Sequence, residues 1–267
     1  MQWHEVLERN ILLVLSQCRV PGGAPEGGQF ASCDGGQFGK WQKASDLETA
    51  SENLIDMGIT GQLMHSEFGD PAMDRAVLSR VNELGDHMND VFAARPELVD
   101  FYDKYHARLD INLAFSKGER LTYANDDGVA RTAAGLWSPD DATIELPVGD
   151  KRVGLPQPAV GVPPGKLRGT PMNVGRGFTD TFRHELGHGL YDSLPTKHQK
   201  GWEKLHNDLG GSNYFKRAVS VYSGTNSGEA FAESFSAWSH PGYGTSTRGG
   251  SELPAAVETY FNEVFGG

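Results

Sequence analysis

The sequence predicts an α+β domain over residues 45–267, with a small sheet followed by a cluster of helices. Two short stretches, 111–115 and 142–146, alternate between apolar and polar residues, as half-buried strands do. From about residue 179 onward, apolar residues recur mainly at helical spacing. Strands followed by a run of helices are typical of the α+β class.

The composition fits a globular protein and restricts its partners. The chain has 267 residues, of which 38% are hydrophobic and 10% aromatic, so it can form a substantial core. Its formal net charge of -11 argues against electrostatic binding to nucleic acid or to anionic membranes. No apolar run approaches the roughly 20 residues of a membrane span. We therefore expect a soluble protein with neither a nucleic-acid nor a membrane partner.

Residues 1–44 are expected to lie outside the main domain. The pattern over 3–15 predicts a short amphipathic helix, and residues 20–40 are rich enough in Gly and Pro to form a linker. Glu5 and Glu8 precede the apolar run, where a secretory signal would carry positive charge. We therefore expect no secretory signal.

Three helices are expected before the first strand. The first begins at Ser45-Asp46-Leu47-Glu48, which has the spacing of a capping box, and the others begin at Pro71 and Pro96. The residues expected to face the core are Leu47, Leu54 and Met57 in the first helix, Met73, Val77, Val81 and Leu84 in the second, and Val99, Tyr102, Tyr105 and Leu109 in the third.

The strands and later helices follow in order. Ile111, Leu113 and Phe115 are expected to point inward from one strand, and Ala142, Ile144 and Leu146 from another. Residues 147–178 hold many Pro and Gly and predict a long irregular connection, which in a compact domain is usually functional or mobile. Helices are expected over about 179–193, 197–209 and 227–239, and from Pro254 onward.

The stretch that predicts chemistry is His184-Glu185-Leu186-Gly187-His188. Residues four apart on a helix project from one face, so both imidazoles can reach one metal ion, with Glu185 at the edge of that face. Such a pair is a common part of a zinc site, where a nearby carboxylate can take a proton from zinc-activated water. The histidines could alternatively lie on a solvated face, but the helix has an apolar face, which favours zinc binding.

Zinc needs a third protein ligand. Residues 189–194 read GLYDSL, which excludes a third histidine soon after the first two. Among later glutamates, Glu229 and Glu233 are four apart in apolar surroundings, so we expect Glu229 to bind the metal and Glu233 to hydrogen-bond a ligating histidine. Two alternatives stay open: Glu229 could close a helix N-terminus, or both could lie on a solvated face. The other downstream candidates are Glu203, Glu252, Glu258 and Glu263.

Two motifs of the chain resemble the catalytic domain of the anthrax toxin lethal factor family. They are His184–His188 and the run YSGTNSGEAFAESF at residues 222–235. The resemblance implies a zincin-like metalloprotease domain of the gluzincin type, with a small sheet, an active-site helix and a C-terminal helical subdomain. It also implies that residues 135–139, running into 142–146, form the edge strand that pairs with the substrate backbone.

The same resemblance implies a role for each site residue. One Zn²⁺ per chain would be held by His184, His188 and Glu229. Glu185 would be the general base, and Tyr222 would stabilise the oxyanion; Tyr214 is a weaker candidate for that last role. The chain has no room for the large domains that deliver lethal factor and choose its substrate, so toxin delivery is not implied.

A second resemblance concerns origin. The segment VPGGAPEGGQFAS, at residues 20–32, is similar to short segments of phage virion and head-morphogenesis proteins. It implies a phage-encoded protein, located in a virion or in host cytoplasm, with a virion or assembly partner bound through residues 1–44.

The sequence thus predicts a zinc-dependent endopeptidase acting on a protein or peptide substrate. Two alternatives stay open: a non-catalytic zinc-binding structural or interaction protein of a phage particle, and a toxin or effector protease. An intact Glu185 favours an enzyme, because zinc binding alone does not need it. The seven histidines outside the motif are expected to be ordinary surface or core residues. Neither the substrate nor the oligomeric state follows from the sequence.

Overall fold

The structure is a computed structural model that describes residues 40–57, 59, 62–65, 69–105, 111–124, 130–150, 173–175, 177–244 and 252–266. The predicted N-terminal helix, the linker up to residue 39 and the virion-like segment lie outside these residues, as does most of the predicted 147–178 connection. The described part is mixed α/β, with several helices around a small sheet, as an α+β chain should be.

The main sheet has four strands in the order β1-β2-β6-β5. The first three, β1 (Gln62–His65), β2 (Asn112–Ser116) and β6 (Thr143–Pro147), run parallel, whereas β5 (Leu136–Ser138) is antiparallel to β6. The residues predicted to point inward from β2 and from β6 are buried there, except Ala142, which precedes β6 with a positive φ of 46°. A separate hairpin joins β3 (Leu121–Ala124) to β4 (Ala130–Ala133).

The expected edge strand needs a correction. The sequence placed the substrate-pairing edge along 135–146, but β6 lies inside the sheet, between β2 and β5. Among the strands that the structure describes, the edge on this side is β5 alone. Strand order is set by pairing between distant segments, which local alternation does not encode.

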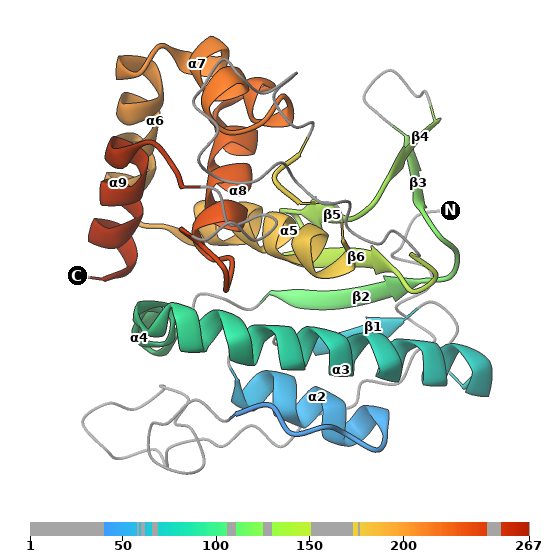
Figure 1. The fold of residues 1–267 in the computed structure, drawn as a ribbon. Coiled ribbons are helices and arrows are strands. Elements are labelled where there is room, and N and C mark those ends of the chain that lie inside the picture. The colour runs from blue at the N-terminus through green and yellow to red at the C-terminus, as the bar shows by residue number, and fades with distance from the viewer. Residues whose placement is uncertain are drawn as a thin grey trace.

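Figure 1 shows α2 and α3 along one side of the sheet and α5 along the other. In α2 (Leu47–Asp56) the N-cap is Asp46, whose side chain accepts a hydrogen bond from the Thr49 backbone N–H at 2.8 Å. Helix α3 (Pro71–Ala94) starts with proline at its first position, where no N–H is needed. Helix α4 (Pro96–Tyr105) follows directly.

One residue of a predicted helix face is not fully buried. Among the side chains of α4 that the structure describes, Leu98 and Phe101 are buried, whereas Val99 is only half-buried; the side chains of Tyr102, Tyr105 and Leu109 lie outside the described part. Leu98 and Phe101 are three apart and share a face, and Val99 lies about 100° around the helix from Leu98. The periodicity therefore predicted the helix, but not the burial of Leu98 and Phe101.

Residues 40–44, which were expected to lie outside the main domain, lie on α3. Trp41 and Ala44 of this segment are in the hydrophobic core. The Asn89 side chain accepts a hydrogen bond from the Trp41 N–H at 2.8 Å and donates one to the Trp41 carbonyl at 3.2 Å. Asn82 makes the same pair of bonds with the Ala44 backbone, at 2.8 and 3.1 Å. Two asparagines one heptad apart therefore hold this extended segment on the helix.

The remaining helices are α5 (Phe178–Ser193), α6 (Thr196–Asp208), α7 (Gly211–Ala218), the short 3-10 turn η2 (Tyr222–Gly224), α8 (Ser227–Trp238) and α9 (Ala255–Phe265). Helix α8 packs along α5, and α6, α7 and α9 all contact α8 (Figure 1). Their shared core is aromatic, with the rings of Trp202, Phe231 and Phe261 within 5.2–5.8 Å of one another. Helix α7 and the turn η2 were not predicted.

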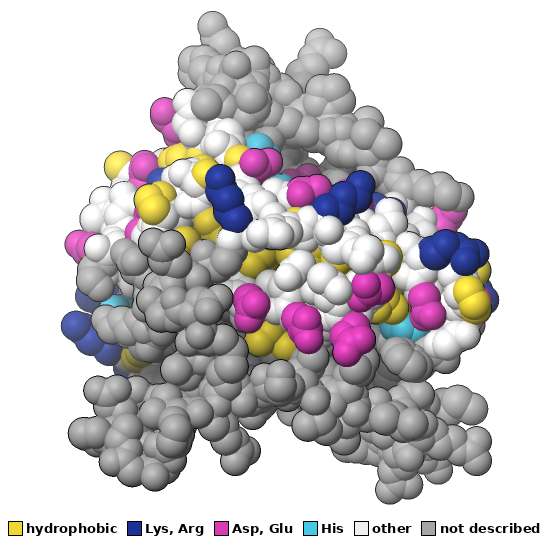
Figure 2. All heavy atoms as spheres, turned by 90° about the horizontal axis from the view of Figure 1, so that it is seen from below, with side chains coloured by type: hydrophobic (Ala, Val, Ile, Leu, Met, Phe, Trp, Pro, Cys, Tyr) yellow, Lys and Arg dark blue, Asp and Glu magenta, His cyan; other side chains and the backbone are white. Residues whose placement is uncertain are grey.

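The surface reflects the acidic composition. Figure 2, which views the molecule from the side of α2 and α3, shows acidic side chains along the described part of this face. The exposed carboxylates of α2 and α3 include Glu48, Glu52, Glu83, Asp86 and Asp90. None of the described helices combines the length and apolar character that crossing a membrane requires.

Candidate metal centre

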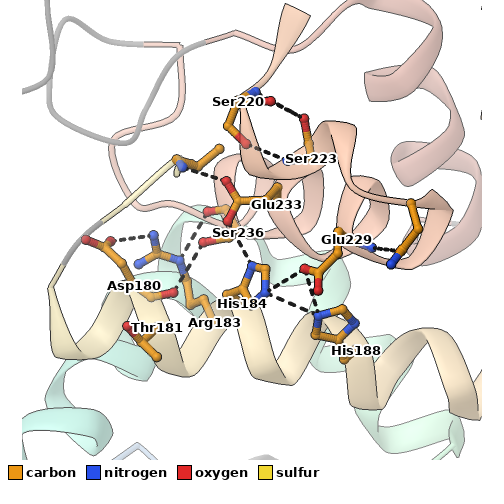
Figure 3. A network of polar contacts seen from close by, with 12 residues as sticks. Asp180, Thr181, Arg183, His184, His188, Ser220, Ser223, Glu229, Glu233 and Ser236 are labelled. Carbon is orange, nitrogen blue, oxygen red and sulfur yellow. Dashed lines mark hydrogen bonds and ion pairs between the residues drawn. The ribbon is translucent and has the colours of Figure 1, made fainter. Parts of the chain in front are cut away.

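Helix α5 carries the two histidines of the HExxH motif. Asp180 closes its N-terminus, accepting a hydrogen bond from the Gly177 backbone N–H at 3.0 Å, and the helix ends just before Pro195. His184 and His188 therefore lie one turn apart on a continuous helix, with ring centroids 4.8 Å apart. The structure brings both imidazoles to the same side of α5, where α8 packs (Figure 3).

Helix α8 brings the third donor. Its N-cap is Asn226, whose side chain accepts a hydrogen bond from the Glu229 backbone N–H at 2.8 Å. It is thus the backbone of Glu229 that joins the cap, while its carboxylate lies against the two histidines. The alternative in which the Glu229 side chain closes the helix end is therefore wrong.

Three donor atoms converge at this point. Glu229 Oε2 lies 3.2 Å from His184 Nε2 and 3.3 Å from His188 Nε2, and the two Nε2 atoms are 3.2 Å apart. The His184, Glu229 and His188 side chains are 12%, 16% and 19% exposed, so the cluster sits just below the surface. These three residues could hold a metal ion.

The donor cluster requires a positive charge among its lone pairs. Burial alone raises the pKa of the Glu229 carboxyl, but hydrogen bonds from His184 and His188 outweigh it and lower the pKa to about 2. Burial likewise opposes protonation of His184, yet hydrogen bonds to Glu229 and Glu233 raise its pKa well above the usual value. Converging lone pairs repel unless a positive charge lies among them. Either a proton on His184 or a metal ion can provide it.

Glu233 orients one of the histidines from behind. Its Oε1 lies 2.9 Å from His184 Nδ1, and its Oε2 accepts a hydrogen bond from the Val174 backbone N–H at 2.7 Å. A carboxylate only accepts, so His184 must carry its hydrogen on Nδ1, which leaves the Nε2 lone pair for the cluster. Glu233 is 2% exposed, so the solvated-face alternative is wrong for this residue.

Glu185 lies beside the donors, against the edge strand. It is 8% exposed, and its carboxylate accepts a hydrogen bond from the Trp137 backbone N–H in β5. Burial raises the pKa of Glu185, partly offset by the nearby His184 and His188. A carboxylate with a raised pKa next to a possible metal ion is well suited to taking up a proton.

Tyr222 reaches the cluster from the turn η2. Its ring centroid lies 5.7 Å from that of His184. Burial, followed by the charge of Glu229, raises the pKa of its hydroxyl above the usual range, so it remains a hydrogen-bond donor at neutral pH. Two fully buried serines hold the turn: Ser220 N–H donates to Ser223 Oγ at 3.1 Å, and Ser223 N–H donates to Ser220 Oγ at 3.0 Å. This reciprocal pattern is a capping box in form, and the S-x-x-S spacing could have signalled it.

The other candidates lie elsewhere. Tyr214 packs against the Phe215 ring in α7. Among the alternative glutamates, Glu203, Glu252 and Glu263 are exposed, and Glu258 lies near Tyr243.

Sequence reasoning missed one cluster. His87 and His240, expected to be ordinary, lie with Asp180 around the buried Arg183, directly behind the donor residues. Its members come from α3, α5 and the segment after α8, so no local pattern could have indicated it.

No protein-family model matches the chain, and a search of curated proteins found no significant match. The assignment of function therefore depends on the geometry of the residues described above.

Proposed function

We propose that this protein is a zinc-dependent endopeptidase of the gluzincin type, with a zincin-like domain related to the lethal factor family. The convergence of His184, His188 and Glu229, with Glu185 at its side, carries the proposal. Zinc, one ion per chain, is the metal that this donor set fits best. Two neutral imidazoles and a carboxylate are common zinc ligands in proteins.

The donor spacing supports zinc. With zinc–ligand bonds of about 2.0–2.1 Å, neighbouring ligands of a tetrahedral site lie about 3.3–3.4 Å apart. The three donor atoms here are 3.2, 3.2 and 3.3 Å apart, so they already have nearly the spacing of one tetrahedral face. Larger cations such as Ca²⁺ prefer six to eight oxygen ligands, a set that two histidines cannot supply.

The number of donors supports a catalytic site over a structural one. Structural zinc sites usually have four protein ligands, whereas catalytic sites have three and leave one position open. Within the described part of the chain, the group that could bind a metal consists of three residues. Glu185 adds a reason, because zinc binding alone requires no buried carboxylate beside the ligands.

Each neighbouring side chain has a role in peptide hydrolysis. Bound zinc would act as a Lewis acid and lower the pKa of a water molecule to about 7. Glu185 takes the proton of the attacking water and passes it to the leaving amine. The Tyr222 hydroxyl donates a hydrogen bond to the oxyanion that forms on the scissile carbonyl. Glu233 keeps His184 in the tautomer that can bind the metal.

The position of the edge strand favours a peptide substrate. Strand β5 lies at the edge of the sheet and contacts Glu185 through the Trp137 N–H. An extended peptide adding to β5 would run past the base and the metal ligands, as strand addition to an open sheet edge allows. We therefore propose that the substrate pairs with β5, within the 135–139 part of the expected segment, and not with 142–146.

Glu185→Gln tests the proposal. A diverse peptide library is incubated with zinc-loaded wild type, with Glu185→Gln and with Glu263→Gln, a matched control at an exposed residue of α9. We expect Glu185→Gln to retain zinc. Its rate of peptide cleavage should fall by about 100-fold to 10,000-fold, because the proton acceptor is gone. The control should cleave like wild type.

Two outcomes would refute the proposal. Full activity of Glu185→Gln would exclude the mechanism. Absence of cleavage by folded, zinc-loaded wild type across the library would favour the structural alternative.

A further inference from the structure

Arg183 is the most deeply buried charged residue beside the candidate metal centre. It is 1% exposed and precedes His184 in α5. Its guanidinium contacts three elements: Nη2 donates to Asp180 in its own helix at 2.8 Å, Nε donates to the Ser236 carbonyl of α8 at 3.2 Å, and Nη1 lies 2.6 Å from His87 Nε2 in α3. One planar group thus joins the metal-binding helix to both of its helical neighbours.

The charges around Arg183 fix which partner donates. Burial, together with the charge of the Arg183 guanidinium, lowers the pKa of His87 to about 3 and that of His240 to about 4. Both imidazoles are therefore neutral near pH 7, and His87 Nε2 accepts the hydrogen bond from Arg183. Asp180 supplies the balancing negative charge, and its pKa is lowered by Arg183 despite its burial.

A buried ion pair of this kind is a weak source of stability. Removing two charges from water costs about as much as their attraction returns, so an apolar pair can often replace it without loss. Such a pair can instead fix the relative positions of the helices that it joins. For Arg183 these are α5, α8 and α3.

Helices α5 and α8 pair residue by residue in an antiparallel register. Along α5, Arg183 meets Ser236, His184 meets Glu233, and His188 meets Glu229, so each step forward in α5 is matched by a step back in α8. The helices cross most closely at Gly187, where an added Cβ would lie 2.9 Å from Ala232 Cα. That contact sets their separation but does not prevent sliding.

A slip of α8 by one residue would move Glu229 by about 1.5 Å along the helix and rotate it by about 100°. The carboxylate would then leave the two histidines. Figure 3 shows the bond from Arg183 to Ser236 and the contacts of Glu229 at different places along α5 and α8. The close approach of Gly187 to Ala232 lies between them in both sequences, so the Arg183 bond resists both movements.

We propose that Arg183 is a positioning residue, which holds α8 in the register on α5 that brings Glu229 to His184 and His188. This inference rests on the proposed function only in that a metal occupies the donor cluster. It predicts that Arg183 affects metal affinity and coordination geometry beyond its effect on stability.

Arg183→Lys tests this role, because lysine keeps the charge beside Asp180 but cannot form the three-way contact. Zn²⁺ affinity is measured by competition with a chromophoric chelator, and the visible spectrum of the Co²⁺-substituted protein reports coordination geometry. We expect the Zn²⁺ dissociation constant to rise about 10-fold to 100-fold, in the range seen when residues supporting metal ligands are changed, and the Co²⁺ bands to shift.

The matched control is Leu54→Ala, which truncates a fully buried side chain in α2. It should lower the urea midpoint while leaving the Zn²⁺ dissociation constant and the Co²⁺ spectrum of wild type. The inference is overturned if Arg183→Lys binds Zn²⁺ and Co²⁺ as wild type does. It is also overturned if Leu54→Ala changes both readouts as much, since loss of stability alone would then explain the effect.

If Arg183→Lys does not fold, His87 supplies a second test. His87→Leu removes the acceptor of the Nη1 contact, whereas the amide oxygen of His87→Gln can replace it. We expect weaker Zn²⁺ binding and a shifted Co²⁺ spectrum for His87→Leu, with recovery in His87→Gln. Wild-type metal binding by both variants would overturn the inference.

These measurements stand apart from the test of peptide hydrolysis, because they need no substrate. A wild type that binds Zn²⁺ but cleaves nothing would refute the proposed function and leave the role of Arg183 to be decided by the spectra. A wild type that binds neither Zn²⁺ nor Co²⁺ would overturn both.

Discussion

Replacing Glu233 by glutamine exchanges one carboxylate oxygen for an NH₂ group. Both oxygens accept a hydrogen bond in wild type, so one of the two bonds is lost. One carboxylate oxygen lies 2.9 Å from His184 Nδ1 and the other lies 2.7 Å from the Val174 backbone nitrogen, and both nitrogens donate. An amide has only one oxygen, so the glutamine side chain can satisfy only one donor and must turn its NH₂ group toward the other. Because the Glu233 side chain is only 3% exposed, water cannot readily replace the missing acceptor.

The expected magnitude follows from these contacts. Leaving one buried donor unsatisfied costs about 1–3 kcal/mol in the free energy of unfolding. Loss of the carboxylate behind His184 should weaken metal binding by about 10-fold to 100-fold. That corresponds to about 1.4–2.7 kcal/mol of binding free energy.

Two assays separate these effects. Urea unfolding of the metal-free protein measures the first, and Zn²⁺ competition with a chromophoric chelator measures the second. The exposed Glu263→Gln variant should match wild type in both. If Glu233→Gln unfolds at the wild-type urea concentration and binds Zn²⁺ with wild-type affinity, the role assigned to Glu233 is wrong.

Three further outcomes are expected. Tyr222→Phe should lower kcat by about 100-fold to 1,000-fold because the oxyanion donor is lost; an unchanged kcat would exclude that role. The variant also loses the hydrogen bond between Tyr222 and Glu229, so its Zn²⁺ affinity is measured beside kcat. Gly187→Ala should destabilise the protein by about 1–3 kcal/mol in urea unfolding and weaken Zn²⁺ binding, because its Cβ would lie 2.9 Å from Ala232 Cα. The pKa of His87 is about 3 in the folded state and higher when unfolded, so its contribution to stability is lost as pH falls below about 6.5. Between pH 7 and pH 5, metal-free wild type should lose about 2 kcal/mol more than His87→Gln in urea unfolding; equal losses would contradict the assigned pKa.

The helices that carry the donor residues could be predicted because their signals are local. The spacing of His184 and His188 depends only on helix periodicity, and so does that of Glu229 and Glu233. The apolar residues around the glutamates indicated correctly that these carboxylates were not solvated. Residues four apart on one helix remain four apart whatever the rest of the fold does.

What could not be predicted depends on contacts between distant segments. The place of β6 inside the sheet follows from pairing with β2 and β5, and the docking of Trp41 follows from an asparagine 48 residues away. Arg183 gave no signal either, because a charged residue in a helix usually faces solvent. Its burial becomes intelligible only when α3 and α8 are placed beside α5.

The antiparallel pairing of α5 and α8 also divides the chain into parts that differ in their tolerance to change. The segment from α6 to η2 leaves α5 and returns to α8, so its two ends are fixed by helices that already contact each other. Lengthening a loop whose two ends are held together lowers the free energy of unfolding only slightly, by about 0.6 kcal/mol for each doubling of the loop length. The turn at Gly210 and Gly211, with φ of 105° and 63°, is its tip. An inserted tag or reporter there should leave the donor residues in place, whereas a single residue added within α8 would rotate Glu229 away from them.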